Sequence, residues 1–235
     1  MIPKIIHYCW FGYGKMPLLA KRCIQSWKKY LPDYEIKEWN EHNFDLSLFP
    51  YAQEAYDAKK YAFVTDVVRL YALYTEGGIY MDTDVEVLKS LDPFLLHTAF
   101  SGFENETQVP TGIMASERGG IWARDNLEYY QNKHFINKNG EMELTTNVVF
   151  ITEYMLQKGL IPNDTFQDFP GLITIYPHDY FCPKSYKDQK IYKTNHTVTI
   201  HHFNGSWKTP KQRFYQNYPQ IVLILSKIKK ILRMR

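Results

Sequence analysis

The sequence has few of the features that mark disulfide-stabilised, zinc-binding or membrane-spanning proteins. Its three cysteines, Cys9, Cys23 and Cys182, are odd in number and form no CxxC pair. That pattern argues against a disulfide framework and against a structural zinc site. The apolar run at residues 1–7 is too short for a signal peptide, and no run reaches the length of a transmembrane helix. We therefore expect a reduced, cytoplasmic setting.

Strong charge of one sign is also missing. A net charge of +3 over 235 residues gives no indication of a nucleic acid partner. The charge is uneven in one place, because residues 227–235 carry five cations and no anion. Residues 216–235 combine these cations with an apolar stripe, which predicts a basic amphipathic helix. Such a helix packs on its own domain or lies peripherally on the inner face of the cytoplasmic membrane.

Strands alternate with helices along the first part of the chain, with no internal repeat and no linker. This order predicts an α/β fold with a mostly parallel central sheet flanked by helices. Sheets of this kind bind ligands at the carboxyl ends of their strands. We expect strands at 4–10, 34–39, 79–82 and 85–88, and helices at 17–30, 52–60 and 62–76.

The most informative stretch is residues 76–85, EGGIYMDTDV. A helix is expected to stop at the glycine pair, and the strand that follows ends in Asp82 and Asp84. Alternation along a strand sends both carboxylates to the same face. Two carboxylates held so close repel each other unless a cation lies between them. An oxygen-only site of this kind suits Mg²⁺ or Mn²⁺ that also binds substrate phosphates, so we predict a metal–diphosphate site.

Three further groups of residues are candidates for the same site. Asp66 and Arg69 lie three residues apart on one side of a helix, either as a local salt bridge or with Arg69 facing a phosphate and Asp66 a sugar hydroxyl. Trp10 ends the first expected strand, either as a core aromatic or as a stacking platform for a base. Near the carboxy terminus, His202 would complete the metal shell if it points into the site, and Lys208 would add a charge for a diphosphate.

Other classes of protein account for parts of the pattern. The sequence has neither a dinucleotide-binding glycine fingerprint nor a P-loop. Residues 79–87 also fit the hhhDxDxV pattern of haloacid-dehalogenase phosphatases, but the expected position near the amino terminus and the later acidic motif are missing. A non-catalytic carbohydrate-binding protein would explain the 16% aromatic content. It would not need an Asp-x-x-Arg helix facing two aspartates.

Three segments together resemble glycosyltransferase family 32, the sugar-binding-region DxD glycosyltransferases that include capsule and lipopolysaccharide enzymes. They are IPKIIHYCWFG at 2–12, AFVTDVVR at 62–69 and GGIYMDTD at 77–84. The resemblance implies a GT-A-like nucleotide-sugar-binding fold, a divalent metal and retention of anomeric configuration. On this basis we expect a single catalytic domain at 1–215, followed by the amphipathic helix at 216–235.

The resemblance also implies roles for individual residues. Trp10 would stack on the nucleobase, and Asp66 would bind the donor sugar. Arg69 would contact the sugar or diphosphate. Asp82 would contact the ribose and the metal, and Asp84 would be the principal metal ligand. Asp82, Asp84 and Arg69 are therefore the expected catalytic residues.

A carboxy-terminal pattern adds two more roles. His202-x-x-Gly205-x-x-Lys208 is similar to the HxxGxxK sequence of related retaining galactosyltransferases. By that resemblance, His202 would bind the metal and Lys208 the donor phosphate. The expected reaction moves a hexose from a nucleoside diphosphate sugar to a glycan acceptor in cell-surface polysaccharide synthesis. UDP-hexose is the favoured donor and GDP-mannose the alternative, Mn²⁺ or Mg²⁺ is the cofactor, and a lipid-linked glycan is one candidate acceptor.

Overall fold

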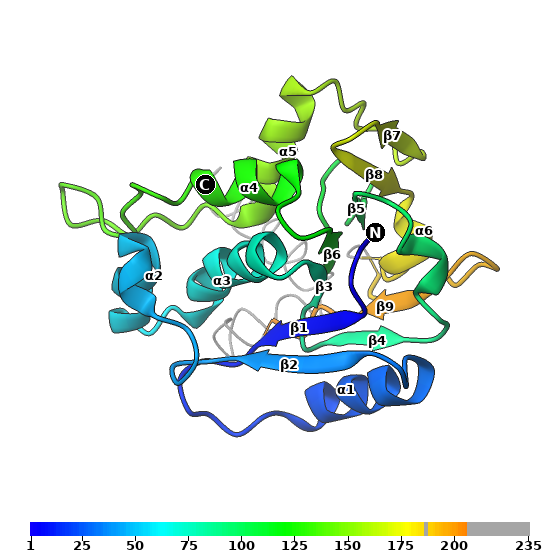
Figure 1. The fold of residues 1–235 in the computed structure, drawn as a ribbon, viewed down its shortest axis with the longest axis horizontal. Coiled ribbons are helices and arrows are strands. Elements are labelled where there is room, and N and C mark those ends of the chain that lie inside the picture. Colours follow the sequence, from blue (N-terminus) through cyan, green and yellow to red (C-terminus); the bar gives the residue numbers. More distant parts are fainter. Residues whose placement is uncertain (186–187, 206–235) are drawn as a thin grey trace, which may run out of the picture.

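A computed structural model describes residues 1–185 and 188–205 of the chain. These residues form a mixed α/β fold, with a seven-stranded sheet and a separate two-stranded sheet (Figure 1). The strands of the large sheet are β1 (Ile5–Cys9), β2 (Glu35–Trp39), β3 (Gly78–Met81), β5 (Ala99–Gly102), β6 (Ile113–Ser116), β7 (Gln167–Phe169) and β8 (Ile173–Tyr176). The small sheet pairs β4 (Val85–Val87) with β9 (Thr199–His201).

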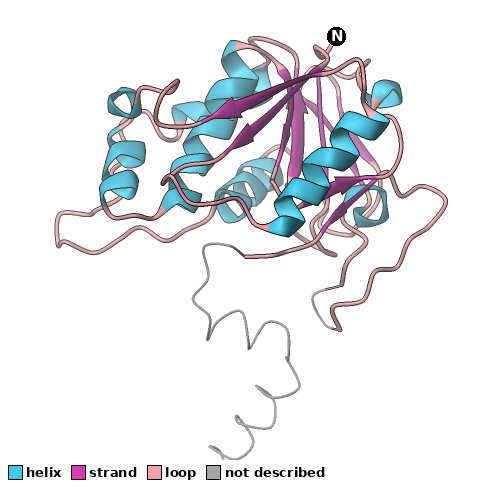
Figure 2. Cartoon of the chain, turned by 90° about the horizontal axis from the view of Figure 1, so that it is seen from below, coloured by secondary structure: helices cyan, strands magenta, loops and turns pink. Residues whose placement is uncertain are grey.

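Helices cover both faces of the large sheet (Figures 1 and 2). They are α1 (Leu18–Tyr30), α2 (Pro50–Asp57), α3 (Tyr61–Thr75), α4 (Ile121–Glu128), α5 (Asn147–Gln157) and α6 (His178–Phe181), with short 3-10 turns at Leu46–Leu48 and Asp92–Phe94. Helix α1 lies on one side, and α3 packs on β1, β3 and β6 from the other. The predicted alternation of strands and helices is thus confirmed.

The large sheet has the order β2-β1-β3-β6-β5-β8-β7. The pairs β1–β2, β1–β3 and β5–β8 are parallel, and the pairs β3–β6, β5–β6 and β7–β8 are antiparallel. It follows that β1, β2, β3, β5 and β8 point in one direction, whereas β6 and β7 point in the other. The carboxyl ends of β1, β2 and β3 therefore meet at one edge, which is where the sequence predicts the site.

Burial on both faces explains the apolar composition of the central strands. In β3, Ile79 and Met81 belong to the core that contains Trp27 of α1. Tyr80, between them, points to the opposite face and packs in the core that contains Val68 of α3. This is the period of two that a strand imposes on its side chains. The chain that continues from β3 into Asp82 therefore emerges between the two hydrophobic cores that pack on opposite faces of the strand.

The double glycine between α3 and β3 is required by the backbone. Gly77 and Gly78 have φ angles of +70° and +109°, which side-chain-bearing residues rarely adopt. A Cβ at Gly78 would also lie 2.7 Å from the carbonyl oxygen of Ile5 in the neighbouring strand. The predicted helix stop is confirmed, and the same residues let β3 enter the sheet close to β1.

A buried histidine links the three strands that lead to the site. The Trp39 indole N–H donates to His7 Nδ1 over 3.0 Å, so the other ring nitrogen carries the proton. His7 Nε2 lies 2.7 Å from the carbonyl oxygen of Gly77 and donates to it. Burial lowers the pKa of His7, against the opposing effect of that carbonyl. A neutral imidazole thus joins β1, β2 and the entrance to β3.

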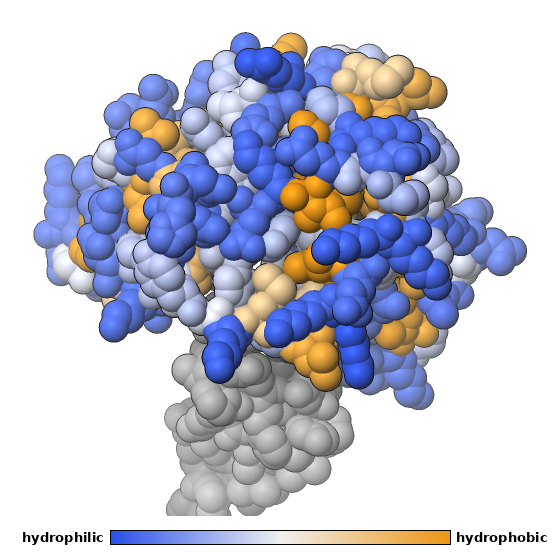
Figure 3. All heavy atoms as spheres, turned by 60° about the horizontal axis from the view of Figure 1, so that its bottom comes forward, coloured by the Kyte–Doolittle hydropathy of each residue, from blue (hydrophilic) through white to orange (hydrophobic). Residues whose placement is uncertain are grey.

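The face drawn in Figure 3 carries mostly hydrophilic side chains, with the hydrophobic ones in small separate groups. Among the helices at 1–185 and 188–205, none is both long enough and apolar enough to cross a membrane. The predicted amphipathic helix at 216–235 and the predicted phosphate ligand Lys208 lie outside the described residues.

Candidate functional site

The two aspartates of the DxD sequence lie in a turn between β3 and β4, as the strands expected at 79–82 and 85–88 imply, although strand alternation does not extend through this turn. The Val85 N–H donates to the Asp82 carbonyl over 2.9 Å and closes this turn. In the small sheet, Val85 pairs with His201 at the end of β9. The antiparallel pairing of β4 and β9 therefore brings a histidine from far along the chain to the acidic turn.

Asp82, Asp84 and His201 each offer one ligand atom, and these atoms lie within 4.8 Å of one another. His201 Nε2 is 3.4 Å from Asp84 Oδ1 and 3.8 Å from Asp82 Oδ2. The Asp82 side chain is the most exposed of the three, at 26%, against 15% for Asp84 and 9% for His201. The two carboxylates suit Mn²⁺ or Mg²⁺, and the imidazole nitrogen favours Mn²⁺ of the two. The residues thus fit the metal that the sequence predicts.

His202, which the sequence predicts as the third metal ligand, points elsewhere. Its Nε2 atom lies 2.9 Å from a carboxylate oxygen of Glu86. Successive residues of an extended segment project to opposite sides, so the two histidines cannot both face the aspartates. The geometry therefore favours His201 in place of His202.

The charges within the cluster depend strongly on one another. Burial would raise the pKa of Asp84, but the charge and hydrogen bond of His201, together with the Asn204 N–H, lower it to about 2. That N–H donates to Asp84 Oδ2 over 2.6 Å. Burial opposes protonation of His201, yet the Asp84 charge raises its pKa well above the ordinary value. A divalent cation would displace the histidine proton, because a metal-bound imidazole is neutral.

The His201 ring is held tightly by its neighbours. The Phe203 ring lies 4.2 Å away between ring centroids. A Cβ at Gly112 would approach His201 Nδ1 to 2.9 Å, so glycine leaves the room that the imidazole occupies. The Gly112 carbonyl also accepts a hydrogen bond of 2.9 Å from the Asp82 N–H. Gly112, just before β6, therefore positions two members of the cluster.

Helix α3 supplies a buried guanidinium to the same turn. Arg69 Nη2 is 3.3 Å from Asp66 Oδ1 and 3.4 Å from Asp82 Oδ1. Arg69 also donates from Nε to the Thr65 carbonyl over 3.1 Å and from Nη2 to Thr65 Oγ1 over 3.0 Å. The local salt bridge that we had considered is present, and the same guanidinium reaches the first aspartate of the DxD turn.

Tyr80 belongs to this arrangement and was missed by the sequence analysis. Its hydroxyl donates to Asp82 Oδ1 over 2.9 Å, and its ring centroid lies 4.7 Å from the guanidinium carbon of Arg69. Burial raises the pKa of Tyr80, so the hydroxyl keeps its proton. Its position two residues before Asp82 on an alternating strand was the signal that could have revealed it.

Asp66 forms the most enclosed part of the site. It is 6% exposed, and burial raises its pKa to about 6. The Asn147 N–H at the start of α5 donates to Asp66 Oδ2 over 3.3 Å. The Asn147 Nδ2 and Tyr130 hydroxyl are buried, and neither has a hydrogen-bond partner within the described part of the chain. No motif marked either residue, and only the Thr-Thr-Asn run at 145–147 indicated a polar helix start.

Trp10 lies next to the acidic turn. In the β1–β3 register, His7 pairs with Tyr80, so Trp10, three residues later, is level with the DxD sequence. Its indole N–H donates to the Gly14 carbonyl over 2.6 Å, and its partly buried ring packs against the core. Trp10 therefore has both a core contact and an accessible surface.

A family of known proteins matches the part of the chain that contains α3 and the DxD turn. Residues 17–101, which contain the α3 pair and the DxD turn, match the family model described as "Glycosyltransferase sugar-binding region containing DXD motif". The resemblance to DxD glycosyltransferases is thus supported over this region.

Two relatives carry the likeness in sequence. Inositol phosphoceramide mannosyltransferase 3 of Schizosaccharomyces pombe is 31% identical over 125 residues, which are 50% of this chain and 34% of the relative. An uncharacterized glycosyltransferase of Acanthamoeba polyphaga mimivirus is 29% identical over 224 residues, 86% of this chain and 85% of the relative. The chain thus matches about a third of the fungal protein and most of the viral one.

The solved structure "PaToxG Glycosyltransferase" shares the fold. It superposes with a TM-score of 0.51 at 20% identity and covers 67% of this chain and 69% of its own. The mixed α/β architecture is therefore that of GT-A-type glycosyltransferases, as the sequence resemblance implied.

Proposed function

We propose that this protein is a metal-dependent glycosyltransferase that moves a hexose from a nucleoside diphosphate sugar to a hydroxyl of a glycan acceptor. The convergence of Asp82, Asp84 and His201, with Arg69 against Asp82, carries the proposal. In it, the three clustered side chains hold Mn²⁺ or Mg²⁺. Such a cation, when bound, stabilises the charge that develops on the leaving diphosphate.

The protein's own side chains would bind and orient the donor. Trp10 offers a ring for the nucleobase at the end of β1. Arg69 is fixed by Thr65 and two carboxylates, so its charge needs no rearrangement when the donor arrives. Asp66, beside Asn147, offers buried polar atoms for sugar hydroxyls, and its burial excludes water from them.

We propose the substrates from resemblance. UDP-hexose remains the favoured donor, and GDP-mannose gains support because the fungal relative is named a mannosyltransferase. The same name, with inositol phosphoceramide in it, supports a lipid-linked acceptor. We retain from the family resemblance a retaining reaction in cell-surface glycan synthesis. Lys208 remains a proposed phosphate ligand.

A membrane contact is a separate part of the proposal and rests on sequence alone. We propose a catalytic domain at 1–215 and a basic amphipathic segment at 216–235 that contacts anionic lipid from the cytoplasmic side. Flotation with vesicles that contain anionic lipid would test it. Deletion of 227–235 should abolish flotation with the vesicles, and unchanged vesicle binding would reject the contact.

A panel of UDP- and GDP-sugars, with and without Mn²⁺, tests the main proposal. We expect one donor to raise the melting temperature only when Mn²⁺ is present, and to be hydrolysed slowly to its nucleoside diphosphate. If no donor binds and simple phosphate monoesters are hydrolysed instead, the phosphatase alternative takes its place.

The two adjacent histidines offer a matched control for the metal assignment. His201→Ala should lose both the Mn²⁺-dependent stabilisation and turnover. His202→Ala removes the same side chain one residue away and should keep Mn²⁺ binding. The reverse outcome would return the assignment to His202, and retention of Mn²⁺-dependent stabilisation and turnover by both variants would exclude either histidine as a required ligand.

A further inference from the structure

A lysine that belongs to no motif lies beside the candidate metal cluster. Lys184 follows α6, and its Nζ donates to the His202 carbonyl over 2.6 Å. The His202 N–H in turn donates to the Asp84 carbonyl over 3.0 Å. The ammonium group and the DxD turn are therefore both bonded to one residue, which directly follows His201.

Lys184 is partly buried and lies close enough to Asp84 to be affected by its negative charge. Burial lowers the pKa of Lys184, and the negative charge of Asp84 opposes that shift. The carbonyl of His202 uses one of the three N–H donors of the ammonium. Lys184 is thus a partly buried cation, within electrostatic range of Asp84, that has donors for additional acceptors.

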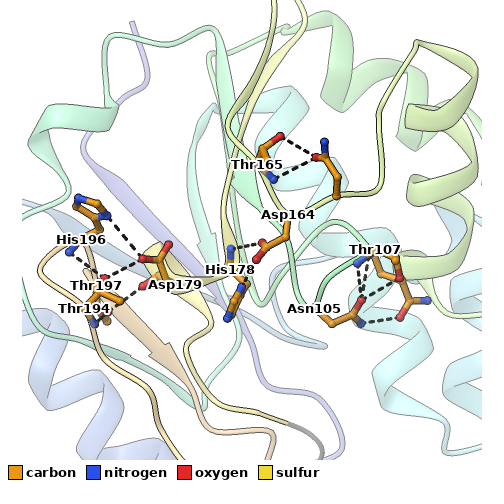
Figure 4. A network of polar contacts seen from close by, with 11 residues as sticks. Asn105, Thr107, Asp164, Thr165, His178, Asp179, Thr194, His196 and Thr197 are labelled. Atoms are coloured by element: carbon orange, nitrogen blue, oxygen red, sulfur yellow. Dashed lines mark hydrogen bonds and ion pairs between the residues drawn. The ribbon is translucent and has the colours of Figure 1, made fainter.

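Helix α6, which precedes Lys184, is held from two sides (Figure 4). On one side, the His178 N–H donates to Asp164 Oδ1 over 2.7 Å. On the other, Thr194 Oγ1 donates to Asp179 Oδ2 and Thr197 Oγ1 to the Asp179 carbonyl, each over 2.8 Å. These bonds fasten α6 to the preceding loop and to the approach to β9. The bond from Lys184 Nζ to the His202 carbonyl then orients the ammonium group before a ligand arrives.

The charges of Asp82, Asp84, a bound divalent cation and Lys184 together indicate which class of ligand would bind beside Lys184. The carboxylates of Asp82 and Asp84 carry two negative charges, which a divalent cation would neutralise. Lys184 would then face a centre with no net negative charge, and a positive charge in that position attracts an anion. The proposed donor brings such an anion in its diphosphate.

We propose that Lys184 is a diphosphate-binding residue of this site, which donates hydrogen bonds to phosphate oxygens of the nucleoside diphosphate. The inference rests on the proposed function and adds a residue that no sequence motif marks. Lys184 lies in the described chain and is independent of the role proposed for Lys208.

Calorimetric titration of the 235-residue chain in Mn²⁺ tests the assignment, with UDP, GDP, uridine and guanosine as ligands. Lys184→Met should weaken binding of the diphosphate that the wild type prefers by about tenfold or more. Binding of the matching nucleoside should not change, because it has no phosphate. Mn²⁺ alone should bind as tightly as before or more tightly, since a positive charge near Asp84 is gone. Lys190→Met, at an exposed position in the same segment, is the matched control and should behave as wild type.

Other results would overturn the assignment. Equal loss of nucleoside, diphosphate and Mn²⁺ binding would show that Lys184 only supports the fold. Lys184→Arg keeps the charge, so a loss as large as that of Lys184→Met would exclude a charge-based role. Unchanged UDP or GDP affinity in Lys184→Met would reject the role of Lys184 in diphosphate binding and leave the proposed function of the protein in place. A wild type that binds neither nucleotide would reject the proposed function, and this inference with it.

Discussion

Addition of one methyl group at Gly112 should weaken metal binding without removing any metal ligand. A Cβ at Gly112 would lie 2.9 Å, 3.0 Å and 3.1 Å from His201 Nδ1, Cε1 and Cγ. Carbon contacts are most favourable at about 3.5–4.0 Å, so the ring must retreat by roughly 0.5–1 Å. The φ angle of Gly112 is not in the left-handed region, so the backbone itself accepts alanine. The effect of Gly112→Ala is therefore steric and directed at His201.

The size of the effect follows from the role of a neighbour that orients a ligand. Changes to such neighbours typically reduce metal affinity about 10–100-fold. Overpacking of a tight site also costs about 1–3 kcal/mol of the free energy of unfolding. We therefore expect Gly112→Ala to fold, to melt at a somewhat lower temperature, and to bind Mn²⁺ about 10–100-fold more weakly than the wild type.

Electron paramagnetic resonance of free Mn²⁺ measures this affinity without nucleotide or turnover. Gly14→Ala is the control, because a Cβ at Gly14 meets no atom within 4 Å and its φ angle is not positive. It should bind Mn²⁺ as the wild type does. If Gly112→Ala also binds like the wild type, then the position of His201 does not determine metal affinity, and the three-ligand site is wrong.

Three other changes follow from the described contacts. Arg69→Met leaves the carboxylates of Asp66 and Asp82 without their shared cation. The free energy of unfolding in urea should therefore fall by about 3–5 kcal/mol. A loss below ~1 kcal/mol would show that Arg69 does not stabilise these two carboxylates. Burial lowers the pKa of His7 below 6.5, so its contribution to stability is complete above pH 6.5 and is lost as the pH falls. Unfolding free energies at pH 7 and pH 5 should therefore differ less in His7→Gln than in the wild type, and equal pH slopes would refute this. Trp10→Ala should weaken UDP or GDP binding and leave Mn²⁺ binding unchanged, and intact nucleotide affinity would leave Trp10 a core residue.

Local periodicity was enough to predict the elements that carry the first half of the site. The helix expected at 62–76 is α3, Tyr61–Thr75, and the helix expected at 17–30 is α1, Leu18–Tyr30. These segments are long or strongly patterned, and their ends carry turn residues such as Gly77. Two short elements, β7 and α6, gave no such signal and were not expected.

Pairing between distant strands was not predictable from the sequence. The identity of the histidine at the cluster depends on the register of β9 against β4, where His201 lies opposite Val85. A shift of one residue would place His202 there instead, because a strand alternates its side chains. Lys184 and Asn147 likewise reach the site only through tertiary packing, so no local pattern identifies them.

The counter-charges of the aspartates show why the acidic turn is stable in the fold. We expected Asp82 and Asp84 to need a cation between them, yet each carboxylate has a positively charged partner from a different segment. Arg69 of α3 serves Asp82 and Asp66, and His201 of β9 serves Asp84. A metal ion at this turn would replace protonated His201 as the counter-charge of Asp84. The His201 ring, then neutral, would be one of the ligands of that ion. The fold thus holds the two aspartates in place by itself, and changes at either cationic partner should alter the site even where the DxD sequence is intact.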